Sequence, residues 1–113
     1  MTADCIFCKI AAGEVGADVL FEDDDILAFR DVRPVAPTHV LVIPRKHITS
    51  LAQADPEDQA LLGKLLLGVR RVADELGLVE AGYRTIINTG RGAGQTVFHL
   101  HVHVMSGRAW TWP

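Results

Sequence analysis

The sequence lacks the features that mark several protein classes. It has no apolar run as long as a transmembrane helix, and its first residues lack the basic and apolar regions of a secretory signal peptide. It also has no internal repeat, linker or low-complexity tract. The net charge is −3 without a basic stripe, which disfavours a nucleic acid partner but leaves a mononucleotide open. We therefore expect a cytoplasmic protein with no membrane partner and no nucleic acid partner.

Cysteine is also scarce, because Cys5 and Cys8 are the only two in the chain. In a reducing compartment, a Cys-x-x-Cys pair indicates half of a zinc site or a redox pair rather than a structural disulfide. The redox interpretation expects a strand before the pair, and the chain has no room for one there. A zinc site needs two more ligands, which histidines could supply. Two inert, buried small residues remain an alternative.

What the chain does contain is typical of an ordinary globular domain. Hydrophobic residues make up 49% of its 113 residues and charged residues 22%. This length is enough for one domain with a substantial core. We therefore expect a single domain over residues 1–113.

Histidine is concentrated in one stretch, where three of the five histidines alternate with aliphatic residues from His99 to Val104. A period of two predicts a half-buried strand, with Leu100, Val102 and Val104 toward a core and the histidines in a row on the other face. Side chains on one face are about 6–7 Å apart, so the rings can tilt toward one anion or metal. The row predicts a metal site or histidine catalysis, and the residues alone leave both open.

The rest of the pattern predicts an α+β chain. We expect a short helix over residues 5–13 and a long helix that begins at Asp55-Pro56 and ends at Gly77. Besides the histidine strand, strands are expected over residues 19–22, 26–30, 39–43 and 83–88. The long helix has a wide apolar stripe and contains Gly63 and Gly68. Packing on one sheet would explain neither the stripe nor the glycines, whereas both would fit close packing against a second subunit.

A glycine-rich loop, Thr89–Gly94, runs into the histidine stretch. Glycines let a backbone approach a phosphate closely, and successive backbone amides can bind an anion. A plain flexible hairpin is the alternative, and the position directly before the histidines favours the anion-binding loop.

Several motifs in the right order resemble the HIT (histidine triad) family and its Hint branch, over residues 5–113. They are His99–Val104, Pro37–Ile48, Ile87–Gly90, Gly94–His99 and the C-terminal Gly107–Pro113. The resemblance implies a single HIT domain with the α+β HIT-like fold. This fold has an antiparallel sheet of about five strands, one short N-terminal helix and one long helix. The resemblance also implies a homodimer in which the sheet extends across both subunits.

The same resemblance implies a purine nucleotide-binding hydrolase that cleaves adenosine 5′-phosphoramidates or acyl-adenylates to AMP. His101 would be the nucleophile, attacking the α-phosphorus to form a nucleotidyl-histidine that water cleaves. His103 would bind a phosphate oxygen, and His39 would assist proton transfer. Thr96, where many Hint relatives have serine, would contact the leaving group. Asn88 would orient the phosphate or leaving group.

A nucleotide pocket is implied as well. Asp31 would accept hydrogen bonds from the ribose hydroxyls, and backbone amides from Gln95 to Val97 would stabilise the phosphate charge together with Asn88 and His103. The base would lie among apolar residues, namely Ile6, Phe7, Ile10, Phe29 and Val32. Trp112 resembles a tryptophan that reaches toward the partner subunit's site, although packing on the dimer surface would explain it equally well.

Resemblance to zinc-binding bacterial members implies a structural zinc ion held by Cys5, Cys8, His47 and His99, with no open position for chemistry. Other functions remain open at this point. One is a zinc hydrolase in which all three histidines of the row bind a catalytic metal. Another is a nucleotide-binding sensor or interaction protein without significant turnover. The last is a dinucleoside polyphosphate hydrolase.

Overall fold

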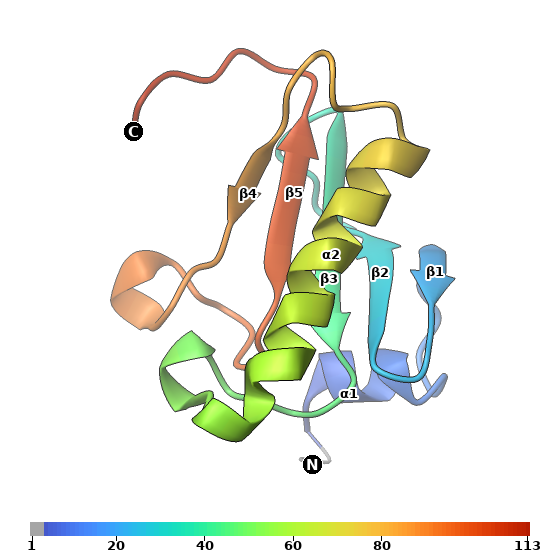
Figure 1. The fold of residues 1–113 in the computed structure, drawn as a ribbon, viewed down its shortest axis with the longest axis vertical. Helices are drawn as coiled ribbons and strands as arrows, with labels where there is room; N and C mark the ends of the chain where they lie inside the picture. Colours follow the sequence, from blue (N-terminus) through green and yellow to red (C-terminus); the bar gives the residue numbers. More distant parts are fainter. Residues whose placement is uncertain (1–3) are drawn as a thin grey trace.

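The computed structural model describes residues 4–113, so the first three residues of the expected domain lie outside it. Its centre is a five-stranded antiparallel sheet in the order β1-β2-β3-β5-β4 (Figure 1). The strands are β1 (Val19–Glu22), β2 (Ile26–Arg30), β3 (Thr38–Pro44), β4 (Arg84–Ile86) and β5 (Val102–Ser106). Helix α2 (Gln59–Glu75) crosses one face, and the short helix α1 (Ile6–Ala11) packs on the other. The predicted α+β fold class is therefore confirmed.

The start of the long helix follows its capping residues. Asp55 and Asp58 form a reciprocal capping box, with Pro56 in the first turn. Residues Pro56–Asp58 form a 3-10 turn, so α2 itself begins only at Gln59, three residues later than the sequence predicts. Gly77 follows the end of the helix. Its φ angle of +67° is a backbone conformation that favours glycine.

The core under α2 is built from alternate residues of the strands. Leu100, Val102 and Val104 are at most 1% exposed and pack with Leu65 and Val72 of α2. The predicted core face of the histidine stretch is therefore confirmed. The opposite face forms a second cluster in which α1 covers residues of β2 and β3. This second face carries the histidines.

Gly68 is explained by this same chain rather than by a second subunit. A Cβ atom at Gly68 would lie 2.5 Å from Cδ1 of Ile26 and 3.2 Å from Cγ1 of Val42, so the helix approaches its own sheet closely there. A Cβ at Gly63 would meet nothing within 4 Å. The expectation that packing on one sheet explains neither glycine is therefore wrong for Gly68.

The histidine strand is shorter than predicted, because β5 begins at Val102 and not at His99. Val102 pairs with Val42, so the preceding residues would pair with Ile43 and Pro44, where β3 ends. Proline has no N–H to donate to a ladder. The backbone of Leu100 donates instead to the carbonyl oxygen of Ile48. Strand β4 is likewise shorter than the predicted 83–88.

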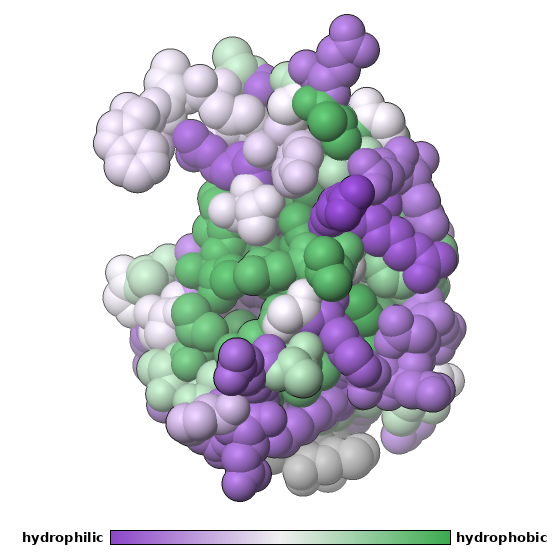
Figure 2. All heavy atoms as spheres, viewed as in Figure 1, coloured by the Kyte–Doolittle hydropathy of each residue, from purple (hydrophilic) through white to green (hydrophobic). Residues whose placement is uncertain are grey.

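Hydrophobic residues remain exposed around α2. Figure 2 shows hydrophobic residues gathered on the face viewed with α2 in front. Leu66 and Leu67 of this helix are 55% and 63% exposed. Within residues 4–113, no helix is both long and apolar enough to cross a membrane.

Candidate functional site

A cavity of about 690 Å³ lies on the sheet face opposite α2. Its volume is in the range of small-ligand sites. Most of the predicted site residues line it, namely Ile6, Phe7, Ile10, Phe29, Asp31, Val32, His39, Asn88, Thr96, Val97, His101 and His103. The structure thus brings together residues that are far apart in the sequence. Val32 is 89% exposed and therefore stands at the rim.

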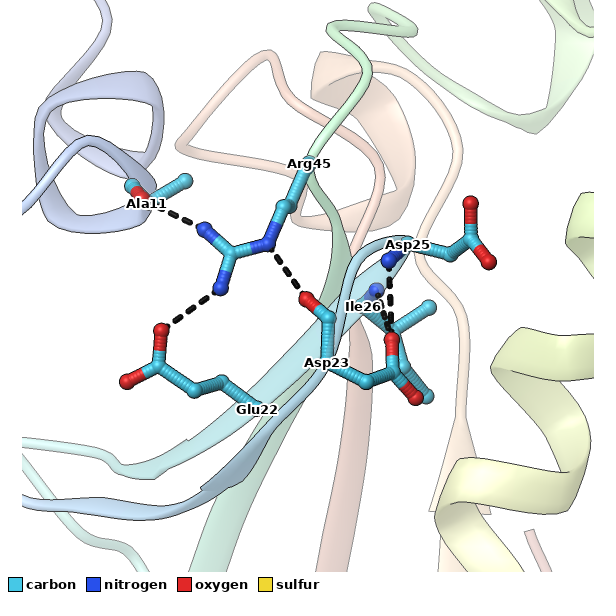
Figure 3. A network of polar contacts seen from close by, with 6 residues as sticks. All are labelled: Ala11, Glu22, Asp23, Asp25, Ile26 and Arg45. Carbon is cyan, nitrogen blue, oxygen red and sulfur yellow. Dashed lines mark hydrogen bonds and ion pairs between the residues drawn. The ribbon is translucent and has the colours of Figure 1, made fainter.

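Arg45 ties the apolar wall of this cavity to the sheet. Its guanidinium donates to the carbonyl oxygens of Ala11, at the end of α1, and of Asp23, in the β1–β2 turn (Figure 3). It also forms an ion pair with Glu22 at 2.6 Å. Arg45 follows β3 directly, so one side chain joins α1, the hairpin and the central strand. This contact helps to position Ile6 and Ile10, which line the cavity.

His101 stands at the centre of the histidine row with a defined proton position. Its Nδ1 lies 2.7 Å from the carbonyl oxygen of His99, which only accepts, so Nδ1 carries the proton and donates it. Burial lowers the pKa of His101 below its ordinary value, although this bond and Asp31 oppose the shift. Phe7 packs edge-on against the ring, with centroids 5.1 Å apart. A neutral ring with an unprotonated Nε2 is the form that can act as a nucleophile.

His39 and His103 form a directly bonded pair beside Asp31. Nε2 of His39 lies 2.9 Å from Nδ1 of His103, and 3.4 Å from a carboxylate oxygen of Asp31. Burial lowers the pKa of both histidines, and the pKa of His103 falls to about 4 with further contributions from His101 and His39. Both rings are therefore neutral at pH 7.

Asp31, His39 and His103 also place their donor atoms within 4.8 Å of one another, as metal ligands would. The backbone N–H of Val35, however, donates to Nδ1 of His39. Neutral His39 then carries its proton on Nε2, the atom that would have to bind the metal. Moving the proton to Nδ1 would make two N–H groups, those of His39 and Val35, face each other without an acceptor between them. The geometry therefore favours a hydrogen-bonded pair over a metal at this group.

A second group, Cys5, Cys8, His47 and His99, has the donor set of a metal centre. All four ligand atoms lie within 4.8 Å of one another. The S···N distances are 3.3 Å from Cys5 to His99, 3.3 Å from Cys8 to His47 and 3.5 Å from Cys8 to His99. Tetrahedral zinc with ordinary bond lengths requires S···N separations of about 3.5 Å. The predicted residues are thus gathered in a geometry that fits a zinc ion.

The proton of His99 is placed to suit this group. Its Nε2 donates to the carbonyl oxygen of Pro44 over 2.8 Å, which leaves the Nδ1 lone pair facing the two sulfur atoms. Burial lowers the pKa of His99 to about 4, so the ring is neutral, as metal ligation requires. Cys5 and Cys8 form no disulfide.

Gln95 lies apart from the cavity lining. Its side chain is buried and bonds to the backbone of Gly90, Thr49 and Val97. It therefore holds the glycine-rich loop in place rather than offering its side chain to a ligand. Its neighbours Thr96 and Val97 do line the cavity.

Some lining residues were not predicted from the sequence. Leu41 and Met105 lie two residues from His39 and His103 on the same strands, so the period of two could have indicated them. Val35 acts through its backbone N–H, for which a side-chain pattern carries no signal.

Comparison with known proteins agrees with this fold and these motifs. A family model described as the HIT domain matches residues 12–110. An uncharacterised HIT-like protein of Synechococcus elongatus is 56% identical over 113 residues, covering 100% of this chain and 98% of that protein. A solved HIT family hydrolase of Legionella pneumophila is 50% identical with a TM-score of 0.94, covering 97% of this chain and 98% of that one.

A third similar protein is a solved histidine triad family protein of Mycobacterium smegmatis described as zinc-bound. It is 39% identical with a TM-score of 0.78, over 93% of this chain and 76% of that one. The antiparallel sheet and the histidine-lined cavity define a protein of the histidine triad class. The chain belongs to the HIT domain family, and it has the fold of proteins described as HIT family hydrolases.

Proposed function

We propose that this protein is a purine nucleotide-binding hydrolase of the Hint branch, which cleaves adenosine 5′-phosphoramidates or acyl-adenylates to AMP. The observation that carries the proposal is the hydrogen bond from Nδ1 of His101 to the oxygen of His99 at 2.7 Å. It leaves Nε2 of a neutral imidazole unprotonated in the cavity. Because Nε2 need not lose a proton before it reacts, it can attack a phosphorus atom at neutral pH.

In the proposed reaction, Nε2 of His101 attacks the α-phosphorus and the P–N or P–O bond to the leaving group breaks. An amine leaving group takes up a proton relayed by the His39–His103 pair, whereas a carboxylate leaves as the anion. Water then hydrolyses the nucleotidyl-histidine to AMP and returns a proton to that pair. His103 donates from Nε2 to a phosphate oxygen, and His39 assists proton transfer through its bond to His103. Thr96 contacts the leaving group, and Asn88 orients it.

The nucleotide would lie along the cavity that these residues line. Asp31 accepts hydrogen bonds from the ribose hydroxyls, and it is held by the backbone N–H of Arg33 at 2.8 Å. The base lies in the apolar part of the cavity, against α1 and Phe29. Backbone amides from Gln95 to Val97 stabilise the phosphate charge.

A structural zinc ion belongs to this proposal. It would be held by the thiolates of Cys5 and Cys8 and by the Nδ1 atoms of His47 and His99, as the S···N distances allow. Four protein ligands leave no open position, so the ion would stabilise the fold and supply no chemistry to the reaction. A catalytic metal shared by the three histidines is less well supported, because the ring of His99 is 0% exposed and turned toward the cysteines.

The proposal also includes a homodimer built on the face that carries α2. Leu66 is 55% exposed on this helix, and β4 lies at an edge of the sheet formed by the described residues. A second copy placed here would cover apolar side chains and could extend the sheet. Equilibrium sedimentation that gives the mass of one chain would contradict the dimer.

The test is the release of AMP from an adenosine 5′-phosphoramidate by the wild type and by His101→Ala, with and without brief chelation. Asp24→Ala, an exposed change in the β1–β2 turn outside the cavity lining, is the control. We expect turnover in wild type and control, surviving chelation, and loss of at least about a thousandfold in His101→Ala. Absence of AMP release in wild type would favour a nucleotide sensor, unless diadenosine polyphosphates are split instead. Activity in His101→Ala that chelation removes would favour a metal hydrolase.

A further inference from the structure

The backbone of Val35 joins the C-terminal tail to the histidines of the cavity. Its N–H donates to Nδ1 of His39 over 3.1 Å, and its carbonyl oxygen accepts from the guanidinium of Arg108, also over 3.1 Å. The Val35 side chain is 58% exposed, so these backbone bonds account for its part in the site better than side-chain packing does.

We propose that the loop over residues 31–37 determines which ring nitrogen of the cavity histidines carries the proton, with the amide of Val35 and the side chain of Arg108 as its positioning groups. We call this arrangement the tautomer lock. A ring nitrogen that accepts a hydrogen bond carries no proton, so neutral His39 holds its single proton on Nε2. That proton is donated to Nδ1 of His103 over 2.9 Å. His103 therefore carries its own proton on Nε2.

The lock decides which atom of His103 can serve a substrate. With Nδ1 occupied by His39, only the N–H at Nε2 is left to donate. If the amide of Val35 were missing, His39 could shift its proton to Nδ1, and the bond could reverse so that His103 donates from Nδ1 and no longer has an N–H at Nε2. Any effect of the lock on turnover rests on the proposed function. The tautomers of His39 and His103 follow from the hydrogen bonds alone.

The tail holds the loop at two points. Gly107 has φ +96°, and a Cβ atom there would lie 2.9 Å from Cβ of Pro37, so the close approach of tail and loop requires glycine. Arg108 follows, and its guanidinium lies 4.6 Å from the ring centroid of Trp110, as does that of Arg84. Arg84 comes from β4, so the tail is itself anchored to the sheet. The contact of Arg108 with the carbonyl oxygen of Val35 is thereby linked to His39 through the backbone of Val35.

The experiment is a long-range ¹H–¹⁵N correlation spectrum of histidine-labelled protein at pH 8, without substrate, which reports the tautomer of each ring. We expect His39 and His103 to carry their protons on Nε2 in wild type and in Val35→Ala, which keeps the amide. Val35→Pro, which lacks it, should give mixed tautomers at His39. A wild-type His39 protonated on Nδ1 would overturn the lock, whether or not the proline variant folds.

Arg108 is tested in the same way. Arg108→Ala should mix the His39 tautomers and lower kcat on the order of tenfold while KM stays within about twofold. Arg108→Lys, which keeps one donor, should recover part of the loss, and Asp24→Ala should resemble wild type. Unchanged tautomers in Arg108→Ala would overturn the role of the tail.

The two proposals can fail separately. Correct tautomers with no AMP release in wild type would support the lock and remove the phosphoramidase function. AMP release together with unchanged tautomers in a folded Val35→Pro protein would remove the lock and leave the function standing.

Discussion

His99 connects the cysteine group to the central histidine, because its carbonyl oxygen accepts the Nδ1 proton of His101 over 2.7 Å. Its ring faces the sulfur atoms of Cys5 and Cys8 on one side and donates to Pro44 on the other. The backbone that orients His101 is therefore held in place by the group that fits a zinc ion. Loss of the metal ligands should disturb the orientation of His101 as well as stability.

Cys8→Ser tests this connection. The substitution removes a thiolate at 3.3 Å from His47 and 3.5 Å from His99, so we expect zinc content to fall from about one ion per chain to near zero. If the ion contributes on the order of 3 kcal/mol, the unfolding midpoint should drop by at least about 10 °C. Elemental analysis and thermal unfolding provide the measurements, and prolonged chelation of wild type should give the same midpoint. A full zinc complement in the variant would contradict the assignment.

The buried histidines predict how stability depends on pH. Burial lowers the pKa of His39 and takes that of His103 to about 4, whereas both titrate near their ordinary value of about 6.5 when unfolded. Between these values the unfolded chain binds more protons, so the free energy of unfolding should fall as the pH drops from about 6.5 toward 4. His103→Gln should show a shallower fall in urea titrations at several pH values. Equal slopes in both proteins would argue against a neutral His103.

Prediction from the sequence succeeded where a side-chain pattern repeats with the period of its element. The alternation from His99 to Val104 predicted both the core face and the histidine face, and the capping signals at Asp55 and Pro56 placed the long helix within three residues. The start of β5 was missed, since it depends on where the partner strand ends. The contact of Val35 with His39 was missed too, since a backbone N–H has no residue-type signature.

Gly68→Ala and Gly63→Ala should have opposite effects on stability. At Gly68 the new methyl group would press on Ile26 and Val42, at a cost of about 1–3 kcal/mol that the gain in helix propensity of up to ~1 kcal/mol only partly offsets. At Gly63 it meets nothing within 4 Å of the same chain, so a subunit outside the proposed dimer keeps only the gain. Urea unfolding measures both. Ile26→Val deletes the Cδ1 atom that lies nearest, so Gly68→Ala should lower the free energy of unfolding by less in that background. An equal loss in both backgrounds would mean that this contact is not the cause.

Arg45→Ala should loosen α1 and weaken nucleotide binding together. The guanidinium donates to Ala11 and Asp23 and pairs with Glu22, so its removal takes away three contacts that run in different directions (Figure 3). Because hydrogen bonds from a charged donor contribute about 1.5–3 kcal/mol, we expect a loss of about 2 kcal/mol in unfolding free energy. The dissociation constant for AMP should rise, because Ile6 and Ile10 on α1 line the cavity. Arg45→Lys, with one compact ammonium group, should recover only part of either loss. Calorimetric titration with AMP and urea unfolding measure the two effects, with Asp24→Ala, an exposed change in the same β1–β2 turn, as the control. An Arg45→Ala protein that binds AMP like the control would show that α1 keeps its position without this contact.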